Sequence, residues 1–169
     1  METKIRLGVS SCLLGLPVRY DGGHQLAPFL VEGIGPHVEW VPVCPEAECG
    51  FGVPREPMRL EGDPQRPRLV TVETRVDQTA RMLAWARRRV AELEGENLCG
   101  FIFKANSPSC GIERVEVCAE AGAAAERGVG LFARIFMEHF ARLPVEDEAR
   151  LRDPRAREDF TARVLALKS

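Results

Sequence analysis

The chain has 169 residues, of which 45% are hydrophobic and 28% are charged, so it suits one folded domain and is not a disordered chain. The formal net charge of −2 gives no overall attraction to nucleic acid, and no DNA partner is expected. No apolar run is long enough to span a bilayer, and the first residues lack the apolar core of a signal peptide, so we expect a cytoplasmic protein with no membrane partner.

Short apolar runs with turn residues at their ends predict strands near 5–9, 38–43 and 98–103, in the manner of parallel strands that are buried on both faces. Apolar residues at three- and four-residue steps predict amphipathic helices over 77–93 and around 132–143. A last helix is expected to begin at Asp153-Pro154, an N-cap followed by proline.

Strands that alternate with helices predict an α/β fold with a mostly parallel sheet, helices on both faces and a single domain over 1–169. The segment 50–68 is rich in proline, glycine and charge, so we expect a long functional loop there. Four arginines of the helix at 77–93 fall mostly off its apolar face. We favour a solvated helix surface over an RNA-binding patch for Arg81, Arg87, Arg88 and Arg89.

Six cysteines are many for a cytosolic chain of this size, and in a reducing compartment they indicate metal binding, redox chemistry or buried thiols. For Cys99 and Cys118 we favour small buried side chains. Cys12 follows the first predicted strand, Cys44 ends the second, and Cys110 lies in the loop after the third. The carboxyl ends of parallel strands line one crevice, so these three thiols are expected to meet there.

Several kinds of site would use such thiols. A structural zinc needs four ligands, and Cys49 could be the fourth; an iron–sulfur cluster with only three cysteines keeps one iron open. A catalytic cysteine would need a histidine base, and none of His24, His37 and His139 lies in a recognisable pairing motif.

Residues of reactive types flank the cysteines. Glu46 lies two residues beyond Cys44, where it could act as a general base, and Ser107, Ser109 and Lys104 precede Cys110. Each alone is ordinary turn chemistry, but three converging loops with a cysteine in each favour a functional site.

Three stretches resemble the sequence blocks of the TudS-type desulfidase family, which contains thiouracil desulfidases: VSSCLLGLPVRYDG (9–22), VCPEAECGFGVPR (43–55) and KANSPSCG (104–111). The resemblance implies a Rossmann-like α/β domain with a [4Fe-4S] cluster held by Cys12, Cys44 and Cys110. One iron would stay open to the sulfur of the substrate. Glu46 matches the catalytic acid/base of the family, and Ser107 matches the serine that assists at the substrate.

The resemblance further implies hydrolytic, non-redox removal of sulfur from a thiolated uracil base or nucleoside, without nicotinamide or flavin. Arg19, Tyr20, Arg55, Lys104 and Ser109 are the expected substrate-binding residues, with loop anchoring as the alternative for the first three. Cys49 departs from the family pattern and is either a spectator or a sulfur acceptor.

The stretch 128–160 is similar to the branch in which this domain is fused to a YbgA-type domain. Those two-domain proteins resemble enzymes that remove sulfur from 4-thiouridine in tRNA, so tRNA is an alternative partner. We expect no YbgA-type domain in this chain. The other alternative to a desulfidase is a non-catalytic structural or redox module that binds zinc or an iron–sulfur cluster.

Overall fold

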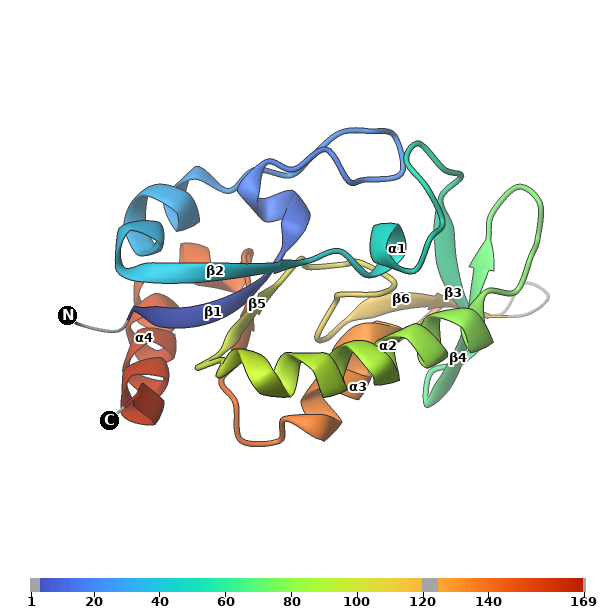
Figure 1. Cartoon of the computed structure of the whole chain (residues 1–169). Coiled ribbons are helices and arrows are strands. Elements are labelled where there is room, and N and C mark those ends of the chain that lie inside the picture. Colours follow the sequence, from blue (N-terminus) through green and yellow to red (C-terminus); the bar gives the residue numbers. More distant parts are fainter. Residues whose placement is uncertain (1–3, 120–124, 169) are drawn as a thin grey trace.

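The centre of the protein is a parallel sheet with the strand order β2-β1-β5-β8. The computed structural model describes residues 4–119 and 125–168. The strands of this sheet are β1 (Ile5–Ser10), β2 (Val38–Val43), β5 (Phe101–Phe103) and β8 (Val145–Asp147). Both neighbours of β1 are parallel to it, so the carboxyl ends of β1, β2 and β5 lie at one edge (Figure 1).

Helices cover both faces of this sheet. Phe101 and Phe103 point into a core with α2 (Thr79–Leu93) and α3 (Leu131–His139), while Ile102 points to the opposite face. That second face is covered by α4 (Pro154–Lys168) and by a short π-helical turn over 30–34. The predicted α/β class, with a parallel sheet and helices on both faces, is confirmed.

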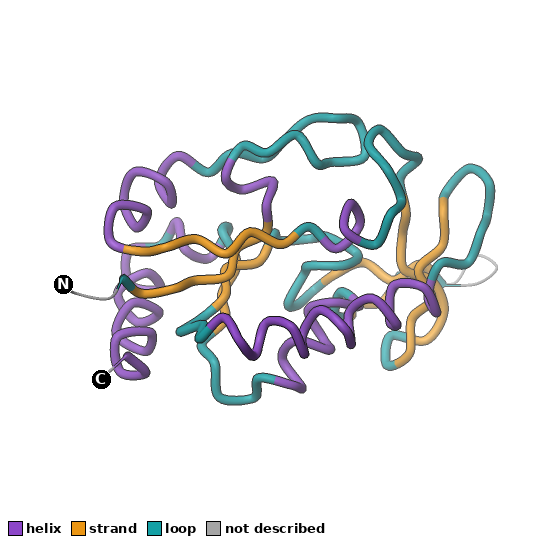
Figure 2. The backbone as a smooth tube through the Cα atoms, in the orientation of Figure 1, coloured by secondary structure: helices purple, strands orange, loops and turns teal. Residues whose placement is uncertain are grey.

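The protein also contains a second, mixed sheet that the sequence analysis did not foresee, with the order β4-β3-β6-β7. Its strands are β3 (Met58–Asp63), β4 (Arg66–Thr71), β6 (Val115–Cys118) and β7 (Glu126–Gly128). The expectation of a continuous loop over 50–68 is therefore wrong from residue 58 onward. Figure 2 shows the two groups of strands.

One hydrophobic core joins the two sheets. It contains Val43 of β2 and Phe101 of β5 together with Leu60 of β3 and Val117 of β6, all packed with α2 and α3. A glycine makes part of this packing possible: a Cβ on Gly8 would collide with the ring of Phe101, which lies across β1.

The boundaries of several elements differ from the predictions. Asn97 adopts a left-handed conformation, with φ of 53°, and the third strand begins only at Phe101. Helix α3 ends at His139, so Phe140 and Leu143 pack against the core from the following turn. Helix α4 begins as predicted, with the Asp153 side chain accepting a hydrogen bond from the Arg155 N–H. Across 4–119 and 125–168, no helix is long and apolar enough to cross a membrane.

Candidate active site

A cavity of about 250 Å³ opens at the carboxyl ends of β1, β2 and β5. Four chain segments line it: the turn after β1, the start of α1 (Pro45–Glu48), the segment 55–58 before β3 and the loop after β5. All ten sequence-predicted site residues are among its lining residues: Cys12, Arg19, Tyr20, Cys44, Glu46, Arg55, Lys104, Ser107, Ser109 and Cys110. The structure therefore brings together side chains that are up to 98 positions apart in the sequence, from Cys12 to Cys110.

Cys12 is held in a short 3-10 turn that directly follows β1. The carbonyl of Cys12 accepts hydrogen bonds from the amides of Gly15 (3.2 Å) and Gln25 (3.0 Å). Gly15 has φ of 88°, a left-handed conformation that glycine adopts without steric cost. The turn thus reverses the chain immediately after the thiol and leaves the side chain of Cys12 on the cavity wall.

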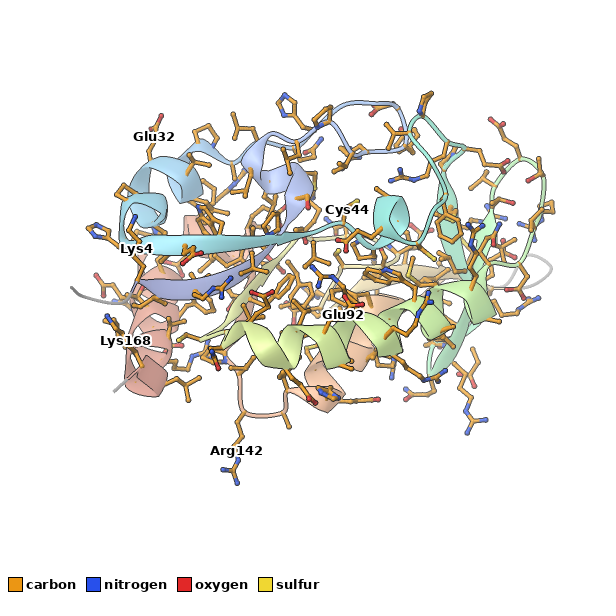
Figure 3. All side chains as sticks on the ribbon, viewed as in Figure 1. Lys4, Glu32, Cys44, Glu92, Arg142 and Lys168 are labelled. Carbon is orange, nitrogen blue, oxygen red and sulfur yellow. The ribbon has the colours of Figure 1, made fainter. Side chains whose placement is uncertain are left out.

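Cys44 lies at the junction of β2 and α1, where Figure 3 labels it. Its N–H donates to the Glu48 carboxylate at 2.8 Å, and the other oxygen of Glu48 accepts from Arg89 of α2 at 2.9 Å. The junction is in this way fixed to a long helix of the core. The thiol of Cys44 lies 3.8 Å from the carbonyl of Val18, which also lines the cavity.

Cys110 lies in a loop whose shape is set by Ser107. The hydroxyl oxygen of Ser107 accepts hydrogen bonds from the amides of Ser109 (3.2 Å) and Cys110 (3.0 Å). Its hydroxyl hydrogen stays available for the Ser109 hydroxyl, 3.1 Å away, or for a ligand. Ser107 therefore has a structural role in addition to its predicted role at the substrate.

The same loop serves as the docking site for the first turn of α3. The amides of Leu131 and Ala133 donate to the carbonyls of Pro108 (3.1 Å) and Ser109 (3.0 Å). A helix leaves its first amides without partners inside the helix, and the loop carbonyls satisfy two of them here. The start of α3 and the loop lie so close together that a Cβ added to Gly130 would lie 2.6 Å from the carbonyl carbon of Ser109.

Burial makes the three thiols weak acids. Desolvation raises the pKa of Cys12 to about 11, with the nearby Cys44 as a second cause. Burial also raises the pKa of Cys44 and, most strongly, that of Cys110, which is 4% exposed. Such thiols are poor nucleophiles unless a cation stabilises their thiolate form. None of His24, His37 and His139 lines the cavity, so a cysteine–histidine nucleophile has no support.

The metal-binding side chains that face the cavity include three thiols. Cys44 raises the pKa of Cys12, and both residues raise the pKa of Cys110, so the three thiols lie near one another. Within the described part of the chain, however, no three histidine, cysteine, aspartate or glutamate side chains are arranged to hold one metal ion. Three convergent thiols are ligands of the type that an iron–sulfur cluster takes.

The remaining cysteines lie elsewhere. Cys49 is 8% exposed in the core shared by the two sheets, and its sulfur is 3.6 Å from the carbonyl of Arg81 on α2. It does not line the cavity, which favours the spectator interpretation over that of a sulfur acceptor. Cys99 and Cys118 are half-buried, and neither lines the cavity.

Glu46 is oriented by Arg55. Nη2 of the Arg55 guanidinium donates to Glu46 Oε2 at 2.8 Å and to the carbonyl of Val18 at 2.9 Å. Nη1 donates to the carbonyl of Gly52 at 2.7 Å. The Arg55 side chain is only 5% exposed. The backbone amide of Arg55 also donates to the carbonyl of Tyr20 at 2.7 Å, where the loops after β1 and α1 run side by side (Figure 1). This geometry favours loop anchoring over substrate binding for Arg55.

The other expected substrate-binding residues differ in how accessible they are. Tyr20 is 40% exposed, and the Arg19 guanidinium lies 5.9 Å from the centre of its ring. Ser109 is 2% exposed and bonds to Ser107, which favours a supporting position. Lys104 pairs with Glu148 at 2.8 Å.

Two residues near the site were missed by the sequence analysis. Ser10 accepts a hydrogen bond from the Lys104 amide at 2.9 Å, and its hydroxyl lowers the pKa of the Cys110 thiol, against the larger effect of burial. Glu148 is buried beside Lys104 although 44 positions separate them. Ser10 lies inside the first cysteine block, which was a usable signal. Glu148 lies in none of the three blocks, and only the fold brings it close to the site.

The match with a known protein family covers the residues that line the cavity. The sequence model of the 2-thiouracil desulfurase family matches residues 7–148, a range that contains all the cavity-lining residues. The chain belongs to the 2-thiouracil desulfurase family. The resemblance found in the three sequence blocks is thereby confirmed.

Two further proteins are similar to this member of the 2-thiouracil desulfurase family. The uncharacterized protein YbbK of Bacillus subtilis (strain 168) is 33% identical over 108 residues, which are 61% of this chain and 71% of YbbK. The solved structure of the [4Fe-4S]-dependent thiouracil desulfidase TudS (DUF523Vcz) matches with a TM-score of 0.74 and 26% identity. That match covers 94% of this chain and 99% of the TudS chain.

Proposed function

We propose that this protein is a [4Fe-4S]-dependent, non-redox desulfidase that hydrolyses the C=S bond of a thiolated uracil base or nucleoside. Family membership and the likeness to TudS support the class of reaction. The observation that carries the proposal is the meeting of Cys12, Cys44 and Cys110 with Glu46 in one cavity.

In this proposal Cys12, Cys44 and Cys110 hold the cluster and leave one iron without a protein ligand. When bound, the cluster would supply a Lewis acid that polarises the C=S bond. Cys49 is turned toward α2 and is not available as a fourth ligand in this conformation. A closed four-cysteine site, as in the structural or redox alternative, has no support from this geometry.

Glu46 acts as the general base. Its Oε2 is engaged by Arg55, which leaves Oε1 to accept a proton from water. The water oxygen bonds to the ring carbon, the C–S bond breaks, and sulfur leaves as hydrosulfide, so the products are uracil or uridine. Ser107 donates its hydroxyl hydrogen to the ring or to the charge that develops on it. No electrons are exchanged overall, so neither nicotinamide nor flavin is required.

Anaerobic turnover by the reconstituted protein tests this function. The substrates to compare are 2-thiouracil, 4-thiouracil, 4-thiouridine and thiolated tRNA, with loss of thiocarbonyl absorbance and release of sulfide as the measurements. We expect the free base or nucleoside to be converted. A protein that binds iron and sulfide but converts none of the four would contradict the proposal.

The tRNA alternative and the single-domain organisation over 1–169, without a YbgA-type domain, stay predictions. Two of the four α2 arginines have partners inside the protein, since Arg81 donates to Gly50 and Arg89 binds Glu48. Arg87 and Arg88 are exposed, as expected for a solvated surface. Binding of tRNA that weakens steeply with added salt would support the tRNA alternative.

A further inference from the structure

A buried ion pair lies at the start of the loop that carries Cys110. Glu148 directly follows β8 and is 7% exposed. The two oxygens of the Glu148 carboxylate have different partners. Oε1 is 2.8 Å from Lys104 Nζ, and Oε2 accepts a hydrogen bond from the Ala105 amide at 2.7 Å. Glu148 therefore holds both the side chain and the backbone of the segment that follows β5.

Lys104 connects this pair to the cavity. Its ammonium also donates to the carbonyl of Ala105 at 2.9 Å, and its amide donates to the hydroxyl of Ser10 at 2.9 Å. Ser10 and Cys110 line the same cavity as Lys104. Lys104 lines the cavity, whereas Glu148 does not.

We infer that Glu148 is a positioning residue of this site, which holds the Lys104 ammonium on the cavity wall and fixes the turn leading to Ser107 and Cys110. This inference rests on the proposed desulfidase function. Glu148 acts through Lys104 and Ala105, because both of its oxygens are engaged by them.

The physical reason is the cost of burying a charge. The Lys104 side chain is 16% exposed, and an ammonium that is this buried needs a counter-charge to remain in place. With Glu148 present, the ammonium stays beside Cys12, on which it acts electrostatically. A fixed cation at this position stabilises negative charge that develops in the cavity, and hydrosulfide is the anion that the proposed reaction releases.

The first experiment needs no turnover. Hydrogen exchange is measured by mass spectrometry over 104–110 in cluster-free protein, for Glu148→Ala, for Glu148→Gln and for the control Glu61→Ala. Glu61 is a buried acid of β3 that pairs with Arg59 and Arg75 and does not line the cavity. We expect at least ~10-fold faster exchange in Glu148→Ala than in Glu61→Ala, because the Ala105 amide loses its acceptor. Equal protection in wild type and both Glu148 variants would overturn the inference.

The second experiment separates positioning from plain stabilisation. Glu148→Gln should lower kcat by ~10-fold or more and change KM by less than ~2-fold, since the substrate is neutral and the leaving sulfur is charged. In a Lys104→Met background the same substitution should change kcat by less than ~2-fold, because the ammonium that Glu148 holds is gone and the glutamine oxygen can still accept from the Ala105 amide.

An equal loss of kcat in both backgrounds would show that Glu148 acts independently of Lys104 and would overturn the inference. An inactive wild-type protein that nevertheless shows the faster exchange in Glu148→Ala would contradict the proposed function and leave the positioning of the loop supported. The two failures are therefore distinguishable.

Discussion

Arg55 and Glu46 form a partly buried pair in which Nη2 of Arg55 lies 2.8 Å from Oε2 of Glu46. The remaining hydrogen bonds of the guanidinium go to backbone carbonyls of two loops, so the arginine fixes the carboxylate relative to the walls of the cavity. In the proposed mechanism Glu46 is the general base, which must lie within hydrogen-bond reach of the proton that it removes, and Arg55 would set this position.

Arg55→Met should keep the iron content of wild type but lower kcat by ~10–100-fold, because Glu46 loses its fixed orientation. Arg55→Lys should recover part of this loss, since an ammonium can still pair with the carboxylate. Iron analysis and anaerobic turnover on the same samples check both statements. Arg163→Met is the control, because Arg163 pairs with Asp159 on the exposed face of α4; a similar loss there would contradict the positioning role.

Replacing Cys12, Cys44 or Cys110 by alanine should prevent assembly of a stable four-iron cluster, since each supplies a thiolate that no neighbour replaces. Cys49→Ala, Cys99→Ala and Cys118→Ala should retain iron and sulfide near the wild-type level. The measurement is iron and sulfide content with the visible spectrum after anaerobic reconstitution. Loss of iron in Cys49→Ala would refute the three-ligand assignment.

Glu46→Gln should keep the cluster but lose activity by ~10²–10⁴-fold, because the amide cannot accept the proton of the attacking water. Iron content again serves as the internal control, and turnover of thiouracil is the measurement. Near-normal turnover in this variant would exclude Glu46 as the base.

Gly130→Ala should destabilise the protein by about 1–3 kcal/mol and lower its affinity for iron, because the added methyl group meets the backbone of the Cys110 loop. Gly95→Ala is the matched control, since nothing lies within 4 Å of the added carbon there. Thermal unfolding of the two variants measures the difference in their stability. Equal stability would show that α3 can move away from the loop without cost.

Hydrogen bonds from Arg75 and Arg59 hold the pKa of Glu61 at about 2, below its ordinary value of 4.5. A lowered folded-state pKa contributes stability that is complete above the unfolded-state pKa and is lost as the pH falls through 4.5 toward 2. Glu61→Gln should therefore cost about 1–3 kcal/mol at pH 7. Denaturant unfolding should show this difference shrinking between pH 4.5 and pH 2; a constant difference would contradict the assignment.

The second sheet shows where the sequence pattern failed. Strand β3, with the sequence MRLEGD, buries Leu60 and also Glu61, whose charge is compensated by Arg59 of the same strand and by Arg75 from another segment. Alternation of apolar and polar residues is therefore broken by a buried acid, and the prolines and glycines on either side indicated a loop. Pairing with β4 and β6 decides that this segment is a strand.

The sequence by itself determined the ends of the central strands and the cysteine after each of them. Short apolar runs are sufficient to predict parallel strands, and parallel strands place their carboxyl ends at one edge, so the meeting of Cys12, Cys44 and Cys110 could be expected. Tertiary structure alone decided that Cys49 points away from the cavity, that Arg55 holds Glu46, and that Glu148 holds Lys104. These relationships depend on side-chain direction and on contacts between distant segments, which local sequence patterns do not encode.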